Sequence, residues 1–320
     1  MVFDQTLEYA FFEGNIVPFT EAKISIGTHA LQYGTGAFAG VRGYLAEDGK
    51  TINIFRLHEH AARLLRSAKL LRMELPLTID TLAETMVELT KANAPTSDVY
   101  FRPFVYKASV QLTPRLRNLH DELAVYMLPM GDYLDTKRGQ KAIVSSWTRA
   151  SDNAIPSRGK ITGSYINSSF AKDQAEEMGA DDALMLNADG KIAEGSSCNF
   201  FIVRDGVLIT PPINSDILEG ITRRSVLQLA SELGIPTEQR AIDRSEIYIA
   251  DEAFFCGTGV QLAWIEKIDG RTIGTGTRGT ISEQLSTALF DIFRGRSTDH
   301  GDWLTKVAIE AAVAGTASTR

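Results

Sequence analysis

Short runs of alternating hydrophobic and polar residues predict strands in the first part of the chain. They occur at residues 7–12, 41–44 and 52–55, and turn sequences such as Glu13-Gly14-Asn15 and Asp48-Gly49 separate them. Asp-Gly between two apolar strands is a strong hairpin signal. From Leu57 the apolar period becomes helical, 78–92 predicts a second helix, and strands return at 99–105 and 123–128. The pattern predicts an α+β unit.

A second unit of strands and helices begins near residue 137. Pro129, Met130 and Gly131 interrupt the strand pattern, so we expect domains at 1–129 and 137–320 joined by a linker at 130–136. The second domain should contain helices at 165–178, 222–233 and 282–293, strands at 142–144, 183–186 and 199–203, and Asp-Gly turns at 189–190 and 205–206. Residues after Gly301 show no clear period, and 311–320 should be a frayed tail. The gap between the domains is the expected ligand site.

Length and composition agree with a globular protein of two domains. The chain has 320 residues, of which 44% are apolar and 23% charged. Its formal charge of -7 comes from interspersed residues, which argues against nucleic acid or an anionic membrane as a partner. No apolar run reaches the ~20 residues that cross a bilayer, and the start lacks a secretory pattern, so we expect a cytoplasmic protein. The two cysteines have no metal-ligand spacing, so no metal site is expected.

The stretch from Glu194 to Arg223 carries the clearest sign of chemistry. It contains Glu194-Gly195-Ser196-Ser197-Cys198-Asn199-Phe200-Phe201, then Leu208-Ile209-Thr210, then Leu218-Glu219-Gly220-Ile221-Thr222-Arg223. A glycine before a helix start lets backbone N–H groups face an anion, and Thr222 adds a hydroxyl, although an ordinary helix cap has the same sequence. Together with a carboxylate on a strand and a buried amide, this phosphate cup suits a phosphorylated, protonated heteroaromatic cofactor.

These residues resemble the signature of the class IV (fold type IV) pyridoxal-phosphate aminotransferases. The rest of the chain is most similar to the branched-chain amino acid aminotransferases, from Tyr33-Gly34-Thr35-Gly36-Ala37-Phe38-Ala39-Gly40-Val41-Arg42 to Gly257-Thr258-Gly259. The resemblance covers nearly the whole chain except its C-terminal tail. It implies two α/β-type domains with a D-amino acid aminotransferase-like fold, an active site between them, and pyridoxal 5'-phosphate as the cofactor.

The resemblance also assigns the residues that would bind the cofactor. Lys160, in a loop of small residues that leads into a helix, would hold it covalently and move the substrate's α-proton. Glu194 would pair with the protonated pyridine nitrogen, and Tyr165 would donate to the phenolic oxygen. Each also has a purely structural interpretation, as a solvated charge or a packed ring. The cofactor-binding residues expected are Arg56, which would pair with the phosphate, and Lys160, Tyr165, Glu194, Leu218, Gly220, Ile221, Thr222, Gly257 and Thr258.

A second set of residues resembles the substrate pocket of the branched-chain subgroup. Three aromatic residues and a glycine would form an apolar cavity for isobutyl or sec-butyl groups. Arg102 would pair with the side-chain carboxylate of glutamate or 2-oxoglutarate, unless it extends into solvent from an edge strand. Met130 departs from the pattern, because many relatives have tryptophan there. The substrate-binding residues expected are Tyr33, Phe38, Gly40, Tyr100, Arg102, Tyr133, Thr258 and Gly259.

The activity implied is reversible amino transfer between L-leucine, L-isoleucine or L-valine and 2-oxoglutarate, giving branched 2-oxo acids and L-glutamate. Alternatives on the same fold are a D-amino acid or (R)-amine transaminase, and then an aminodeoxychorismate lyase. Tyr33, Gly40 and Tyr100-Phe101-Arg102 argue against these. A non-catalytic protein that binds the vitamer is an alternative of another class, and Lys160 argues against it. Because the relatives are dimers, we expect a homodimer or a multiple of dimers.

Overall fold

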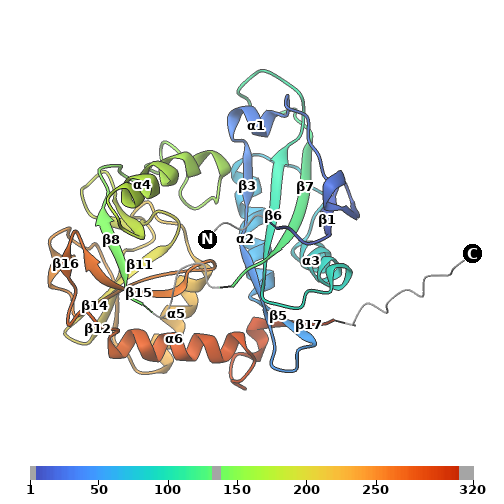
Figure 1. Cartoon of the computed structure of the whole chain (residues 1–320). Helices are drawn as coiled ribbons and strands as arrows, with labels where there is room; N and C mark the ends of the chain where they lie inside the picture. Colours follow the sequence, from blue (N-terminus) through green and yellow to red (C-terminus); the bar gives the residue numbers. More distant parts are fainter. Residues whose placement is uncertain (1–4, 132–137, 310–320) are drawn as a thin grey trace, which may run out of the picture.

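The computed structural model describes residues 5–131 and 138–309, which form two sheets with helices packed against each (Figure 1). The first sheet has the strand order β17-β5-β4-β6-β7-β1-β2, with β3 paired to β6, and its strand pairs are antiparallel. Its elements are β1 (Tyr9–Phe12), β2 (Asn15–Pro18), η1 (Phe19–Glu21), α1 (His29–Tyr33), β3 (Gly36–Phe38), β4 (Val41–Leu45), β5 (Thr51–Phe55), α2 (Leu57–Leu70), α3 (Ile79–Asn93), β6 (Val99–Lys107), β7 (Asp121–Pro129), η4 (Gly301–Trp303) and β17 (Leu304–Ala308).

The second sheet is mixed and has the order β10-β9-β8-β15-β14-β11-β12-β13, with β16 paired to β15. β8 runs parallel to both of its neighbours, and β12 runs parallel to β13. The elements of this part are β8 (Gln140–Val144), η2 (Thr162–Ser164), α4 (Tyr165–Glu177), β9 (Asp182–Leu186), β10 (Ile192–Gly195), β11 (Asn199–Arg204), β12 (Val207–Thr210), α5 (Ile221–Glu232), β13 (Thr237–Gln239), η3 (Glu246–Ile249), β14 (Glu252–Gly257), β15 (Gln261–Ile268), β16 (Arg271–Thr272) and α6 (Thr280–Phe293).

The predicted turns join the strands that the sequence pattern indicated. Asp48-Gly49 lies between β4 and β5, and the Asp-Gly pairs at 189–190 and 205–206 close the β9–β10 and β11–β12 hairpins. Gly49, Gly190 and Gly206 have φ of 66°, 73° and 77°, a backbone region that glycine enters without steric cost. The structure therefore confirms the predicted hairpins and the α+β fold.

The end of the described chain differs from the prediction. β17, which the periodicity did not indicate, pairs antiparallel with β5 from Leu304↔Phe55 to Ala308↔Thr51. These residues therefore join the first sheet, although the predicted boundary placed them with the second domain. Residues 132–136 of the predicted linker and the predicted tail at 311–320 lie outside the described residues, and the domain boundaries stay a prediction.

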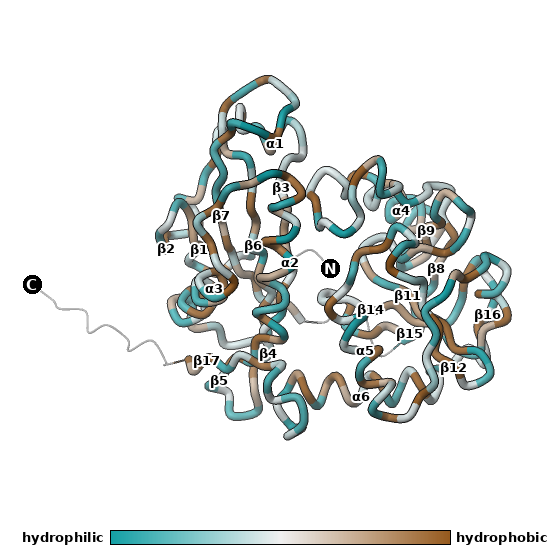
Figure 2. Tube along the Cα trace, turned by 180° about the vertical axis from the view of Figure 1, so that it is seen from behind, coloured by the Kyte–Doolittle hydropathy of each residue, from teal (hydrophilic) through white to brown (hydrophobic). Residues whose placement is uncertain are grey.

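An aromatic cluster connects the two sheets. Helix α6 runs along one edge of the molecule from the second sheet to β5 (Figure 1), and hydrophilic and hydrophobic residues alternate along it (Figure 2). At its end, Phe293 stacks on Tyr44 at 4.4 Å between ring centroids and meets Phe55 edge-on at 4.8 Å. The next residue, Arg294, forms an ion pair of 2.6 Å with Asp98. The first sheet and α6 are thus held in one arrangement. None of the described helices is long and apolar enough to span a membrane.

Replacing Lys107 by methionine tests a buried ion pair of the first sheet. Lys107 Nζ lies 2.9 Å from Asp121 Oδ1, and the side chains are 1% and 4% exposed. The variant leaves a buried carboxylate without its cation, so we expect the free energy of unfolding to fall by about 3 kcal/mol in urea denaturation. The exposed pair Lys91–Glu88 is the control, and Lys91→Met should cost less than about 1 kcal/mol. Equal losses of unfolding free energy in the two variants would contradict a larger contribution from the buried pair.

Candidate active site

A cavity of about 310 Å³ lies between the two sheets, and both parts of the chain line it. Most residues of the predicted site belong to its wall. The structure thus brings together segments that are more than 200 positions apart in the sequence, from Phe38 to Val260. The predicted residues that line the cavity are Phe38, Gly40, Tyr100, Arg102, Lys160, Tyr165, Glu194, Leu218, Gly220, Ile221, Thr222, Gly257, Thr258 and Gly259.

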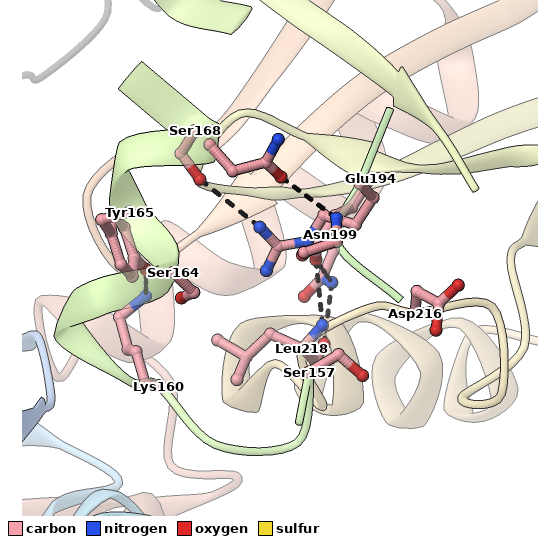
Figure 3. Close-up of polar contacts among 12 residues, drawn as sticks. Ser157, Lys160, Ser164, Tyr165, Ser168, Glu194, Asn199, Asp216 and Leu218 are labelled. Atoms are coloured by element: carbon pink, nitrogen blue, oxygen red, sulfur yellow. Dashed lines mark hydrogen bonds and ion pairs between the residues drawn. The ribbon is translucent and has the colours of Figure 1, made fainter. Parts of the chain in front are cut away.

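Lys160 points into this cavity from the loop before α4, and its amine contacts the hydroxyl of Tyr165 (Figure 3). Burial, and then the charges of Arg63 and Arg102, lower the pKa of Lys160 well below its usual value, while Glu194 opposes the shift. Burial and the nearby Glu194 raise the pKa of Tyr165, so its hydroxyl keeps the proton. An uncharged amine next to a protonated phenol can act as a nucleophile and as a base.

Glu194, at the end of β10, is the acidic residue of the cavity. Its Oε2 accepts from Asn199 Nδ2 at 3.0 Å and from Leu218 N at 3.1 Å (Figure 3), and its Oε1 lies 3.1 Å from Arg149 Nε. Burial raises the pKa of Glu194, whereas Arg149 and the N–H of Leu218 favour the ionised form. These donors orient a carboxylate toward the interior of the cavity.

The N-terminus of α5 forms another part of the wall. No side chain caps this helix, and Ile221 and Thr222 of its first turn line the cavity. The first N–H groups of a helix have no partner within it, so they and the helix dipole favour an anion here. Gly220 is required at this point because a Cβ would lie 1.9 Å from Asn199 Oδ1, and Asn199 holds both Glu194 and the carbonyl of Leu218.

The opposite wall comes from the first sheet. The Arg102 guanidinium lies 4.4 Å from the centre of the Phe38 ring and donates to Tyr100 Oη at 3.3 Å. A Cβ at Gly40 would lie 2.0 Å from the same hydroxyl, so only glycine leaves Tyr100 in place. This wall combines an apolar surface with one cation.

Three predicted residues are not part of the described wall. Arg56 donates to Glu59 at 2.8 Å and to Gln228 at 3.1 Å, and its guanidinium lies 3.6 Å from the centre of the Trp303 ring. Its charge is therefore already paired. Tyr33 is 38% exposed and packs on His29 instead. Tyr133 lies outside the described residues.

Sequence reasoning missed two arginines of the wall, Arg63 and Arg149. Arg63 lies on α2, and no carboxylate of the described chain pairs with it; burial lowers its pKa to about 10. The sequence did contain a sign that Arg63 is buried, because Arg63 and His60 fall on the same face of α2 as Leu57 and Leu64. A basic residue within an apolar stripe indicates a buried function. Arg149 follows a strand in a loop, where the pattern gives no comparable signal.

Arg42 was also missed as a part of the site, although it does not line the cavity. It is 1% exposed and donates to the carbonyls of Met130 at 2.7 Å, Gly131 at 2.8 Å and Gly259 at 3.3 Å. Arg42 thereby fixes the turn at 257–260. Within the described chain, the N–H groups of Thr258 and Gly259 have no acceptor, so they can bind an anion.

The charges of the cavity define its ligand. Arg63, Arg102, Arg149 and Lys160 line it against one carboxylate, Glu194, among the described residues. Lys160 is uncharged and Arg149 pairs with Glu194, so Arg63 and Arg102 are the cations of the wall without a carboxylate partner among the described residues. Buried cations of this kind are costly, so the site favours a negatively charged ligand. The described chain has no cluster of side chains that could hold a metal ion. An anionic ligand that also carries a carbonyl group could pair with the basic side chains of the wall and react with the amine of Lys160.

Comparisons with known proteins agree with this geometry. The family model for class IV amino-transferases matches residues 40–268. A probable branched-chain-amino-acid aminotransferase of Aquifex aeolicus is 45% identical, over 94% of this chain and 97% of the relative. The branched-chain aminotransferase of Thermoproteus uzoniensis with norvaline has a TM-score of 0.90 and 40% identity, covering 94% of this chain and 99% of that one. The branched-chain amino acid aminotransferase of Thermobaculum terrenum in its PLP-form has a TM-score of 0.91 and 36% identity, covering 96% and 100%.

Replacing Arg63 by glutamine tests the electrostatics of the cavity. Removal of this cation should raise the pKa of Lys160, because a nearby positive charge disfavours the ammonium form. At a fixed pH near neutrality, fewer molecules then carry the reactive amine, and reductive methylation of Lys160 followed by mass spectrometry should become slower. Arg66→Gln removes the same charge from the exposed side of α2 and should leave the rate unchanged. Equal methylation rates in the two variants would contradict an effect of Arg63 on the pKa of Lys160.

Proposed function

The chain belongs to the class IV aminotransferase family, and on that premise we propose that it is a branched-chain-amino-acid aminotransferase that uses pyridoxal 5'-phosphate. The observation that carries the proposal is the charge of the cavity, with four basic side chains around one carboxylate beside an uncapped helix N-terminus. A phosphorylated cofactor and a carboxylate substrate together supply the missing negative charge. The names of the relatives support the choice of substrate and cofactor.

The residues of the cavity fit this cofactor at each of its polar groups. The N–H groups of Ile221 and Thr222 suit its phosphate, Glu194 suits a protonated pyridine nitrogen, and Tyr165 suits the phenolic oxygen. We assign the phosphate arginine to Arg63 in place of Arg56, because Arg63 lines the cavity and has no carboxylate partner in the described chain. When bound, the cofactor withdraws electrons from the substrate's α-carbon.

The protein's own groups then perform the proton transfers. Lys160 Nζ takes the α-proton of the amino acid and later returns it, since its lowered pKa leaves the amine uncharged. Tyr165 remains a hydrogen-bond donor, and Glu194 stays oriented by Asn199 and Arg149. The second half of the reaction reverses these steps with 2-oxoglutarate.

The first sheet selects the side chain of the substrate. Phe38, Tyr100 and the space kept by Gly40 provide apolar surface for a branched side chain, and the turn at Thr258 and Gly259 offers N–H groups to the α-carboxylate. Arg102 is available for the side-chain carboxylate of glutamate or 2-oxoglutarate, since no described carboxylate pairs with it. One pocket can thus accept both substrates.

We further propose a homodimer or a multiple of dimers. Large apolar side chains are exposed near α1 and the 109–117 loop, with Ile26 at 85%, Leu112 at 80% and Val110 at 67% exposure. The bridge Thr28↔Val110 shows that these two segments lie side by side. A second copy of the chain would remove this apolar surface from water.

A half-reaction screen tests the proposed function. The purified protein with bound pyridoxal phosphate is mixed separately with L-leucine, L-glutamate, D-alanine and (R)-1-phenylethylamine, and the absorbance of the lysine-bound cofactor is followed. L-leucine and L-glutamate should discharge it. Lys160→Ala cannot form the lysine-bound cofactor, so its rate is followed as formation of the 2-oxo acid from L-leucine. That rate should fall by about 10²- to 10⁴-fold or more, because the variant lacks both the attachment and the base. A response to D-alanine but not to L-leucine would overturn the substrate assignment.

The variant Arg102→Met tests whether Arg102 binds 2-oxoglutarate but not L-leucine. Methionine keeps an apolar stem against Phe38 but cannot pair with a second carboxylate. The KM for 2-oxoglutarate should rise by about 30-fold or more, in line with a loss of ~2 kcal/mol or more for a charge pair that loses one partner. The kcat/KM for L-leucine should fall by a much smaller factor, which reflects only the higher pKa of Lys160 once this cation is removed. Parallel losses for both substrates would show that Arg102 is only structural.

A further inference from the structure

Both backbone polar groups of Lys160 are bound by elements of the first sheet. Its N–H donates to Ser67 Oγ on α2 at 3.2 Å, and its carbonyl accepts from the N–H of Phe38, the last residue of β3, at 3.0 Å. A bridge between Ala37 and Ile161 continues this contact. The loop that carries Lys160 belongs in sequence to the second part of the chain, but the first part holds it in space.

Ser67 makes a second contact with a residue of the site. Its hydroxyl donates to the carbonyl of Arg63, one helical turn earlier, at 3.0 Å, and the residue is only 1% exposed. A hydroxyl has one hydrogen and two lone pairs, so Ser67 can donate to Arg63 and accept from Lys160 at the same time. The hydroxyl therefore links the turn that carries Arg63 to the peptide that carries Lys160.

Close packing keeps the Lys160 loop at this position. A Cβ at Gly159 would lie 2.9 Å from Leu70 Cδ1 on α2, and a Cβ at Gly34 would lie 2.7 Å from the Cα of Gly163. The N–H of Gly163 also donates to the carbonyl of Gly34 at 3.1 Å. The loop thus meets α2 and the end of α1 at near-minimal separation, and Ser67 supplies the hydrogen bond from α2.

We infer that Ser67 is a positioning residue that sets the placement of Lys160 relative to Arg63. The inference rests on the proposed function. There, Arg63 binds the phosphate of the rigid cofactor, and Lys160 binds the carbonyl carbon of the same molecule. Such a ligand reaches Lys160 in a reactive geometry only if the two attachment points keep a fixed separation. Ser67 does not line the cavity and would act through these two residues.

The test compares Ser67→Ala with Thr90→Val, which removes a buried hydroxyl on α3 that donates only to the carbonyl of Met86 at 2.7 Å. Each cofactor-free protein is mixed with pyridoxal phosphate, and covalent capture on Lys160 is followed by absorbance and confirmed by borohydride reduction. Ser67→Ala should slow capture by about five- to tenfold, as expected for one lost hydrogen bond, and should lower kcat with the KM for L-leucine within about twofold. Thr90→Val should match the wild type in both, whatever its effect on Tm.

Equal capture rates in Ser67→Ala and Thr90→Val would overturn the inference. Ser67→Cys, with a weaker donor and acceptor, should fall between the wild type and the alanine variant, and it replaces that variant if alanine prevents folding. A wild-type protein that captures no cofactor would contradict the proposed function alone. In that case hydrogen exchange of the Lys160 amide in the cofactor-free proteins tests the contact between Ser67 and Lys160. Faster exchange only in the Ser67 variants would support this contact, and equal exchange in all the proteins would contradict it.

Discussion

The site depends on one constraint, which is the burial of several positive charges around a single carboxylate. Arg63, Arg102 and Arg149 line the cavity with Lys160, and only Glu194 opposes them among the described residues. Water cannot fully compensate such charges, so the protein lowers the pKa of Lys160 and leaves other cations for a ligand. Burial, together with this imbalance of charge, therefore lowers the pKa of Lys160 and favours an anion in the cavity.

The hydrogen bonds of Glu194 favour its ionised form and fix its orientation in these surroundings. Asn199 and the N–H of Leu218 occupy one carboxylate oxygen, and Arg149 approaches the other. This arrangement needs Gly220, because any larger residue would displace Asn199. The spacing from Glu194 to the helix start is thus a steric requirement as well as a sequence signature, and the structure brings the residues of this signature together in the wall of one cavity.

The sequence predicted the elements whose signals are local. Asp-Gly turns with positive φ defined hairpins, and apolar periodicity defined α2, α3 and α5. Arg56 was predicted to pair with the phosphate, but it does not line the cavity, because Glu59 and Trp303 contact its guanidinium, which only the packed structure shows. β17 could not be predicted either, since its contacts are with β5, about 250 residues earlier in the chain. Long-range pairing of this kind leaves no periodic trace in a five-residue strand.

The two halves of the chain divide the chemistry unequally. Glu194 and the N-terminus of α5 come from the second part of the chain, whereas the wall of Phe38, Gly40, Tyr100 and Arg102 comes from the first. The backbone contacts of Lys160 are with the first sheet as well. The main chain of Lys160 and this wall therefore share one frame, whereas the N–H groups of Thr258 and Gly259 that face the cavity belong to the second part. Residues of the wall can then change to admit other side chains without altering how the second sheet would hold the cofactor.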